Sequence, residues 1–210
     1  MNTFTLIKKS KPKLKAGDYF YYILNNRNYV GVVIHNHLEK QYKEGSSVVC
    51  LFLDYTFDSE KHISVEEIRK NIIEKNLLIP PIIQNRRGWT CGFFCNIGNF
   101  DLDTVYDTLH ECRFATFTGG GMYDFTHVPI KSVIDFKLVG SVGLYTWEGA
   151  EALLQMSLNL DFNPTVPHGS WYDPYRYYDD IKKKNPEMEL PFWYYQAEER
   201  LHGGKNNEQK

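Results

Sequence analysis

The sequence predicts an α+β fold: a strongly bent antiparallel sheet with an SH3-like, barrel-type start and at least two helices. Three short apolar segments follow one another near the start of the chain, as in many small curled sheets and barrels. Two later segments carry apolar residues at helical spacing. Aromatic residues make up 15% of the chain, and they favour strands.

The first strands form a predicted hairpin. Residues 18–24 are aromatic and β-prone, and residues 29–36 are short and β-branched. The turn-like sequence Asn25-Asn26-Arg27-Asn28 separates them, which is typical of a hairpin. Residues 48–57 are apolar on both faces at first, so we expect a central strand there.

The first helix is predicted over residues 65–75, because apolar residues recur at helical spacing after Ser64. Ser64 and Glu67 stand three residues apart, as in a capping box. Residues 77–83 return to extended chain. Pro80 and Pro81 remove two backbone donors, so this piece is predicted to be an edge strand or a connector.

The middle of the chain is predicted to hold more strands. We expect a strand at residues 89–97, with Trp89 filling the core, and a short helix or an irregular link at residues 101–109. Strands are expected at residues 113–117 and 133–142, with a flexible glycine turn at residues 119–121 between them.

The second helix is predicted over residues 147–158. Thr146 is a suitable N-cap, and Glu148 lies in the first turn, where a negative charge suits the helix dipole. These elements define a domain at residues 1–160. An aromatic and proline-rich extension at residues 161–202 is expected to pack on it, and a polar tail at residues 203–210 is expected to be disordered.

Composition limits the function classes. The 210 residues carry a net charge of −2 with a pI of about 6.4, so we expect no nucleic-acid partner. No apolar run is long enough for a membrane span, and the first ten residues lack a signal peptide's apolar core. The expected location is therefore the cytoplasm, where the four cysteines would be free thiols.

A small basic run occupies residues 8–15 and ends at a turn signal, Ala16-Gly17-Asp18. It predicts either a solvated lead-in to the first strand or a contact with an anion or an acidic partner.

Four segments together resemble the Immunity protein 26 family of bacterial polymorphic toxin systems. They are Lys15-Ala-Gly-Asp-Tyr-Phe-Tyr-Tyr-Ile-Leu, Tyr29-Val-Gly-Val-Val-Ile, Pro80-Pro81-Ile-Ile and Arg87-Gly-Trp-Thr-Cys-Gly-Phe-Phe. The resemblance covers roughly residues 12–100. Val30 departs from it, because an aromatic residue is more usual before this glycine, and the region after about residue 160 has no counterpart.

The resemblance implies an α+β domain that binds a cognate protein toxin and blocks it without being an enzyme. The hypothesis is an immunity protein that neutralises the toxin by direct stoichiometric binding in the cytoplasm, as a monomer or weak homodimer and with no cofactor. Two alternatives stay open: a metal-dependent hydrolase that uses His35, His37 and an acidic partner, and a generic SH3-like protein-interaction module.

Other reactive residues favour structural interpretations. His35 and His37 would share a strand face, a spacing that can hold zinc, but no further ligand motif accompanies them. Cys91 and Cys95 would share a strand face at about 13 Å, too far for one disulfide or metal. Cys112 near His110 and Asp107 is a weak nucleophile motif.

Two partner-binding surfaces are predicted. The first is an interface rich in Trp, Tyr and Arg, the residues that dominate hot spots. In it, charged residues such as Asp173 and Arg176 would supply steering and register. The second is an acidic patch. The first comprises Trp171, Tyr172, Asp173, Tyr175, Arg176 and Tyr178, and the second comprises Asp101, Asp103, Asp107 and Glu111.

Overall fold

The computed structural model describes most of the first 158 residues. The described ranges are 4–35, 47–60, 63–115, 122–124, 129–130, 139–141 and 143–158, with the single positions 183 and 186. The predicted extension at residues 161–202, those two positions aside, and the predicted tail at residues 203–210 therefore lie outside the described residues.

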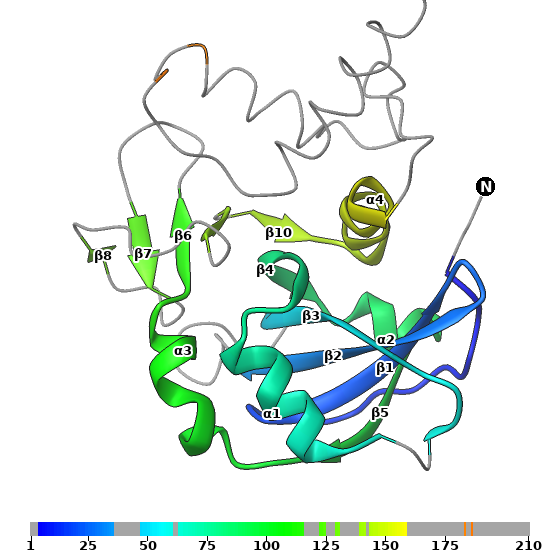
Figure 1. Cartoon of the computed structure of the whole chain (residues 1–210). Coiled ribbons are helices and arrows are strands. Elements are labelled where there is room, and N and C mark those ends of the chain that lie inside the picture. The colour runs from blue at the N-terminus through cyan, green and yellow to red at the C-terminus, as the bar shows by residue number, and fades with distance from the viewer. Residues whose placement is uncertain are drawn as a thin grey trace, which may run out of the picture.

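A six-stranded mixed sheet forms the centre of the fold (Figure 1). Its order is β10-β4-β3-β2-β1-β5, and all pairs are antiparallel except β10 with β4. The α+β class is confirmed, and the sheet is not closed into a barrel. The strands are β1 (Asp18–Leu24), β2 (Arg27–His35), β3 (Ser47–Phe57), β4 (Leu77–Asn85), β5 (Phe94–Asn99) and β10 (Leu144–Tyr145).

A smaller four-stranded sheet has the order β8-β7-β6-β9. Residues 116–121, with the predicted glycine turn, and residues 131–138 lie outside the description, so only parts of the two strands predicted there are seen. The strands are β6 (Arg113–Ala115), β7 (Met122–Asp124), β8 (Pro129–Ile130) and β9 (Val139–Ser141).

The β1–β2 hairpin is confirmed. Leu24 pairs directly with Arg27, so the loop has only two residues. Asn25 and Asn26 both have positive φ, 51° and 61°, as a type I′ turn requires. Asparagine tolerates this conformation better than most residues, and the turn's twist matches that of the strands that it joins.

Helix α1 (Val65–Ile73) begins at the predicted cap. The Ser64 hydroxyl accepts a hydrogen bond from Glu67 N at 3.4 Å. It donates to Glu66 Oε2 at 2.9 Å, and the hydroxyl of Tyr55 accepts from Ser64 N at 3.4 Å. Only one of the two hydrogen bonds of a capping box is therefore present. The Ser64 backbone N–H, from which the Glu67 side chain was expected to accept a hydrogen bond, donates to the Tyr55 hydroxyl instead.

Strand β4 is extended as predicted, but it is not the outermost strand. Strand β10 lies beyond it and covers its Ile83–Gln84 end. The pairing with β3 shifts register between the Cys50–Ile82 and Phe52–Ile79 pairs. Pro80 and Pro81 lie between those pairs, and prolines, which have no N–H, are tolerated at such irregularities.

The strand predicted at residues 89–97 is wrong over its first part. Helix α2 (Arg87–Cys91) occupies this place and ends at Gly92, whose φ is 96°. The Gly92 N–H donates to Gly88 O and Trp89 O, the usual way in which a left-handed glycine ends a helix. Trp89 is fully buried, so core packing overrides the β-propensity of this aromatic segment.

The remaining helices follow the predictions. The segment after Asp101 is helical, as η2 (Leu102–Val105) and α3 (Tyr106–His110). Helix α4 (Trp147–Leu158) has the predicted bounds, and Ala150 N donates to Thr146 O at 3.0 Å at its start.

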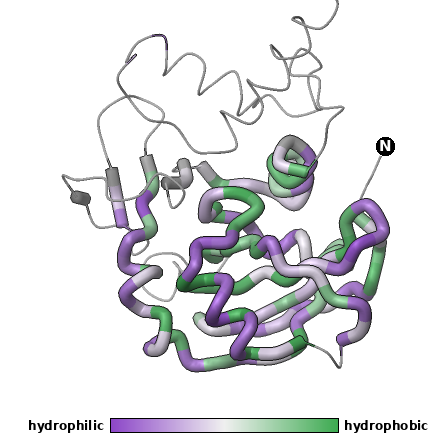
Figure 2. The backbone as a smooth tube through the Cα atoms, in the orientation of Figure 1, coloured by the Kyte–Doolittle hydropathy of each residue, from purple (hydrophilic) through white to green (hydrophobic). Residues whose placement is uncertain are grey.

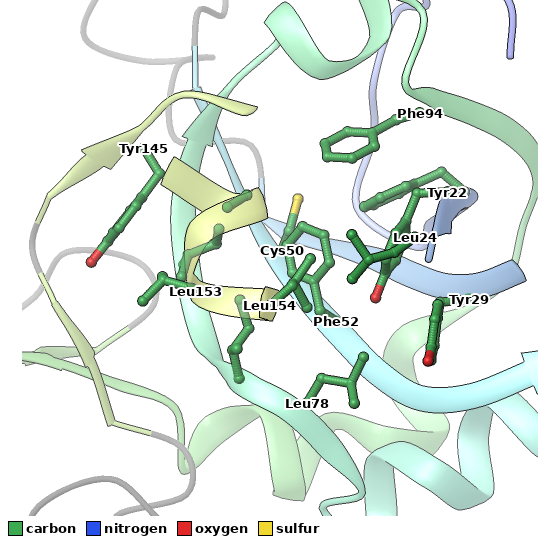
Figure 3. Packing of buried hydrophobic residues seen from close by; sticks show 14 of the residues in the cluster. Tyr22, Leu24, Tyr29, Cys50, Phe52, Leu78, Phe94, Tyr145, Leu153 and Leu154 are labelled. Atoms are coloured by element: carbon green, nitrogen blue, oxygen red, sulfur yellow. The ribbon is translucent and has the colours of Figure 1, made fainter. Parts of the chain in front are cut away.

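Both faces of the sheet are covered, which explains why β3 is apolar on both sides (Figures 1 and 2). Alternate residues of the strands point to each face. On one face, α2 and α4 pack over the sheet, and Leu153 and Leu154 of α4 lie near Cys50 and Phe52 (Figure 3). On the other face, α1, η2 and α3 cover the sheet through Ile68, Ile72, Val105 and Leu109.

A polar network joins the start of β1 to α2 and β5. Trp89 Nε1 donates to Asn96 Oδ1 at 3.1 Å, and Asn96 Nδ2 donates to Asp18 Oδ2 at 3.2 Å. Asp18 also accepts from Lys15 N and Asn99 Nδ2, both at 2.8 Å. The network satisfies a nearly buried carboxylate, which would otherwise be costly.

Candidate functional site

The predicted acidic patch lies on η2 and α3. Asp101 caps η2, and its carboxylate accepts from Asp103 N at 3.0 Å. Val105 and Leu109 are each 2% exposed and anchor the segment to the sheet. Asp103 and Asp107 are exposed, so they are the two aspartates whose charge is most available to a partner.

Helix α1 lies beside this segment, and an ion pair joins the two (Figure 1). Lys75 Nζ lies 2.7 Å from Glu111 Oε2, and the two side chains are 24% and 28% exposed. Such half-exposed pairs contribute about 0.2–1 kcal/mol. Glu111 is thus engaged within the protein, so its charge is less available to a partner.

Two large, mainly apolar side chains are exposed on the helices that cover this face of the sheet. Ile73 at the end of α1 is 53% exposed and Tyr106 at the start of α3 is 50% exposed. The Tyr106 ring stacks on His110, with centroids 5.5 Å apart and 20° between the planes. We call the helical layer of α1, η2 and α3, which carries Ile73, Tyr106 and the four acidic residues Asp101, Asp103, Asp107 and Glu111, the acidic helical face.

Sequence reasoning did not identify Ile73 or Tyr106. In the structure, neither residue falls on the buried stripe of its helix, which Ile68 and Ile72 form in α1 and Val105 and Leu109 form in this segment. A half-exposed tyrosine among carboxylates can serve as a contact residue at an interface, and the carboxylates can steer and orient a basic partner.

The aromatic surface predicted in the C-terminal extension lies outside the described residues. Its members are Trp171, Tyr172, Asp173, Tyr175, Arg176 and Tyr178. The acidic helical face is therefore the predicted partner-binding surface that the structure locates.

The four cysteines are free thiols, as predicted; Cys50 and Cys112 are buried, whereas Cys91 and Cys95, expected to be buried, are partly exposed. Cys112 is fully buried while His110 is exposed, so these neighbours do not form a nucleophile and base. Burial raises the pKa of the Cys112 thiol to about 12 and also raises the pKa of Cys50. The shared strand expected for Cys91 and Cys95 is wrong, since Cys91 belongs to α2 and Cys95 to β5.

The described residues bring no three His, Cys, Asp or Glu side chains together in a metal-binding group. His35 ends β2, and His37 lies outside the described residues. In the described part of the chain, no helix has the length and apolarity to cross a membrane.

Comparison with known proteins finds no match: no family model, no curated protein and no solved structure is similar to this chain.

Proposed function

We propose that this protein is an immunity protein that neutralises a cognate bacterial toxin by direct stoichiometric binding in the cytoplasm. The acidic helical face carries this proposal, because the half-exposed Tyr106 shares one short segment with the exposed Asp101, Asp103 and Asp107, and the neighbouring helix α1 exposes Ile73. The toxin contacts this face through a basic, partly apolar surface. Binding blocks the toxin by covering its active site or by locking its conformation, and the immunity protein catalyses no reaction.

The charge of the helical layer supports a basic partner. Residues 64–75 and 101–111 contain seven carboxylates and three cationic side chains. One cation, Lys75, is already paired with Glu111, and the Arg69 guanidinium lies 5.6 Å from the centroid of the Phe100 ring. The layer is therefore more acidic than the chain as a whole, whose net charge is −2, and it attracts a basic domain at long range.

The two kinds of side chain have different roles. Carboxylates at the rim accelerate encounter and fix orientation, and they change affinity less. The buried contact energy comes from a few anchors, most often Tyr, Trp or Arg. Tyr106 is the anchor in this proposal, and Asp103 and Asp107 are the steering charges.

The test measures binding to the toxin domain encoded by the gene immediately upstream. We expect a one-to-one complex by calorimetry and restored growth when the two proteins are co-expressed. Tyr106→Ala should weaken binding by about 30-fold, the size of a hot-spot loss. The matched control is Leu144→Ala, because Leu144 is 59% exposed but lies on β10.

Charge reversal separates steering from anchoring. Asp107→Lys should slow association, most strongly at low salt, and leave dissociation nearly unchanged. Glu148→Lys is the control, since this exposed acid lies on α4 at the other sheet face. No complex with the upstream product, or many partners of similar modest affinity, would contradict a dedicated immunity protein.

A further inference from the structure

The segment before β1 carries a row of lysines on one side. Lys9, Lys11, Lys13 and Lys15 are exposed. The residues between them turn inward: Leu14 is 2% exposed and belongs to the core cluster beneath α4, and Ser10 and Pro12 are half-buried. This alternation is that of an extended chain with one buried side. We call these four lysines the lysine row.

Hydrogen bonds hold this segment in place. Ile7 N and Lys8 N donate to Gly92 O at 2.7 and 3.1 Å, and Ser10 N donates to Trp89 O at 3.0 Å. Before them, Thr5 N donates to Ile23 O at 2.9 Å. Because the backbone is already ordered, a partner that binds along it loses little additional conformational entropy.

The lysine row lies in a basic stretch of the sequence, and a second basic stretch packs against the segment before it. Residues 4–17 contain five lysines and no acid, and residues 86–92, which include α2, add Arg86 and Arg87 and again no acid. Across the described part of the chain, no carboxylate forms an ion pair with the lysine row. Four unpaired ammonium groups are thus available along one line.

We propose that the lysine row binds an extended acidic segment of a protein partner, with carboxylates at alternate positions. Every second residue of an extended chain repeats at about 6.6 Å. The lysines stand at every second position, so an extended acidic segment with carboxylates at every second position can present one carboxylate to each ammonium group. Charge complementarity and equal spacing together define this occupant.

A phosphodiester chain is the competing occupant, and the overall charge disfavours it. The protein carries a net charge of −2 and an acidic helical layer, which repel a long polyanion. A short acidic segment interacts with the lysine row alone, since charges beyond about 10 Å are screened at 0.1 M salt.

This inference does not depend on the proposed immunity function. Leu14 beside the lysine row packs into the cluster on the α4 side of the sheet, whereas Val105 and Leu109 of the acidic helical face belong to the opposite cluster. Tyr106→Ala should therefore weaken toxin binding without affecting binding of an acidic segment to the lysine row. Substitutions in the lysine row should leave toxin binding unchanged.

The experiment uses the full-length protein and two fluorescent peptides of equal composition. One peptide has aspartates at alternate positions, separated by serine or threonine, and the other has its aspartates in one block. We expect the alternating peptide to bind more tightly by fluorescence anisotropy and the difference to vanish at high salt. An equal Kd for the two peptides overturns the inference.

Variants locate the site. We expect a quadruple variant to bind the alternating peptide about tenfold more weakly, because it removes four exposed ion pairs, each of which contributes little. Its changes are Lys9→Ala, Lys11→Ala, Lys13→Ala and Lys15→Ala. The arginine versions of the same four changes should retain binding, and they test the site if the alanine variant does not fold. An unchanged Kd in the alanine variant, or lost binding in folded arginine variants, overturns the proposal.

A matched pair of double variants controls for net charge. Lys11→Ala with Lys13→Ala should weaken binding, whereas Arg27→Ala with Lys70→Ala, two exposed cations outside the row, should not. The same measurement is made with an oligonucleotide of equal charge. If it binds more tightly than the alternating peptide, the lysine row is a nucleic-acid site, and the inference is overturned.

Discussion

The ring of Phe20 occupies the space that a side chain at Gly31 would fill. The two residues are direct partners across the β1–β2 pair, and a Cβ atom added at Gly31 would lie 2.7 Å from Cε2 of Phe20. The missing side chain lets Phe20 lie against the sheet, where its ring centroid is 4.8 Å from that of Trp89 and 5.1 Å from that of Phe94.

Gly31→Ala should therefore destabilise the protein by about 1–3 kcal/mol, the usual cost of overpacking a core. Urea denaturation measures the loss as a lower midpoint at an unchanged slope. Combining it with Phe20→Leu should recover part of the loss, since the smaller side chain frees the space. Additive losses in the double variant would show that the two residues do not compete for it.

Asn96→Ala should cost about 1–3 kcal/mol, because it leaves the buried Trp89 indole N–H without an acceptor and takes one donor from the Asp18 carboxylate. Asn76→Ala is the control, as its amide donates to Glu74 at 3.0 Å on the exposed surface. Equal unfolding free energies for both variants would mean that the network adds no stability.

Thiol labelling should separate the four cysteines into two classes. Cys50 and Cys112 are fully buried, whereas Cys91 and Cys95 are partly exposed. The partly exposed pair should react first with iodoacetamide in the folded protein, and all four should react in urea. Peptide mass spectrometry identifies the labelled residues. Labelling of Cys50 as fast as Cys91 would contradict the buried position of its strand.

Stability should fall as pH rises above about 8.5, the pKa of an unfolded cysteine. Cys112 keeps its proton in the folded state up to a pKa of about 12, while the unfolded chain releases it. The unfolded state then binds fewer protons, and each pH unit in this window costs up to about 1.4 kcal/mol for this group.

Cys112→Ala should lessen this alkaline loss, although its cavity lowers stability equally at every pH. Urea midpoints between neutral and alkaline pH provide the comparison with the unchanged protein. Parallel curves for the two proteins would show that another group causes the decline.

Local signals predicted the parts of the fold that depend on local chemistry. Asn25 and Asn26 favour the conformation that a two-residue turn needs, and Ser64 begins a helix by accepting from Glu67 N. The strand predicted from Trp89 onward was wrong over its first part because its aromatic residues suit a strand, whereas Trp89 is buried in the core as part of helix α2, which ends at Gly92.

The sequence predicted that the candidate site is acidic, but not which of its side chains are available to a partner. Asp101, Asp103, Asp107 and Glu111 are acidic in any fold, yet their availability depends on tertiary neighbours. Glu111 is paired because α1 brings Lys75 beside it. Which apolar residue stays outside the core also depends on helix orientation, so Tyr106 and Ile73 could not be recognised from sequence alone.

The two prolines of β4 also bear on aggregation. Strand β10 pairs with only Ile83 and Gln84 of β4; the other residues of β4, apart from Asn85, are buried by neighbours that include α4 and β9, and in the described part of the chain they have no strand partner on that side. A row of backbone donors at such a place invites pairing with another molecule. Pro80 and Pro81 have no N–H to offer, and the register shift beside them interrupts the ladder, which protects a hydrophobic strand from template-like growth when the protein is concentrated.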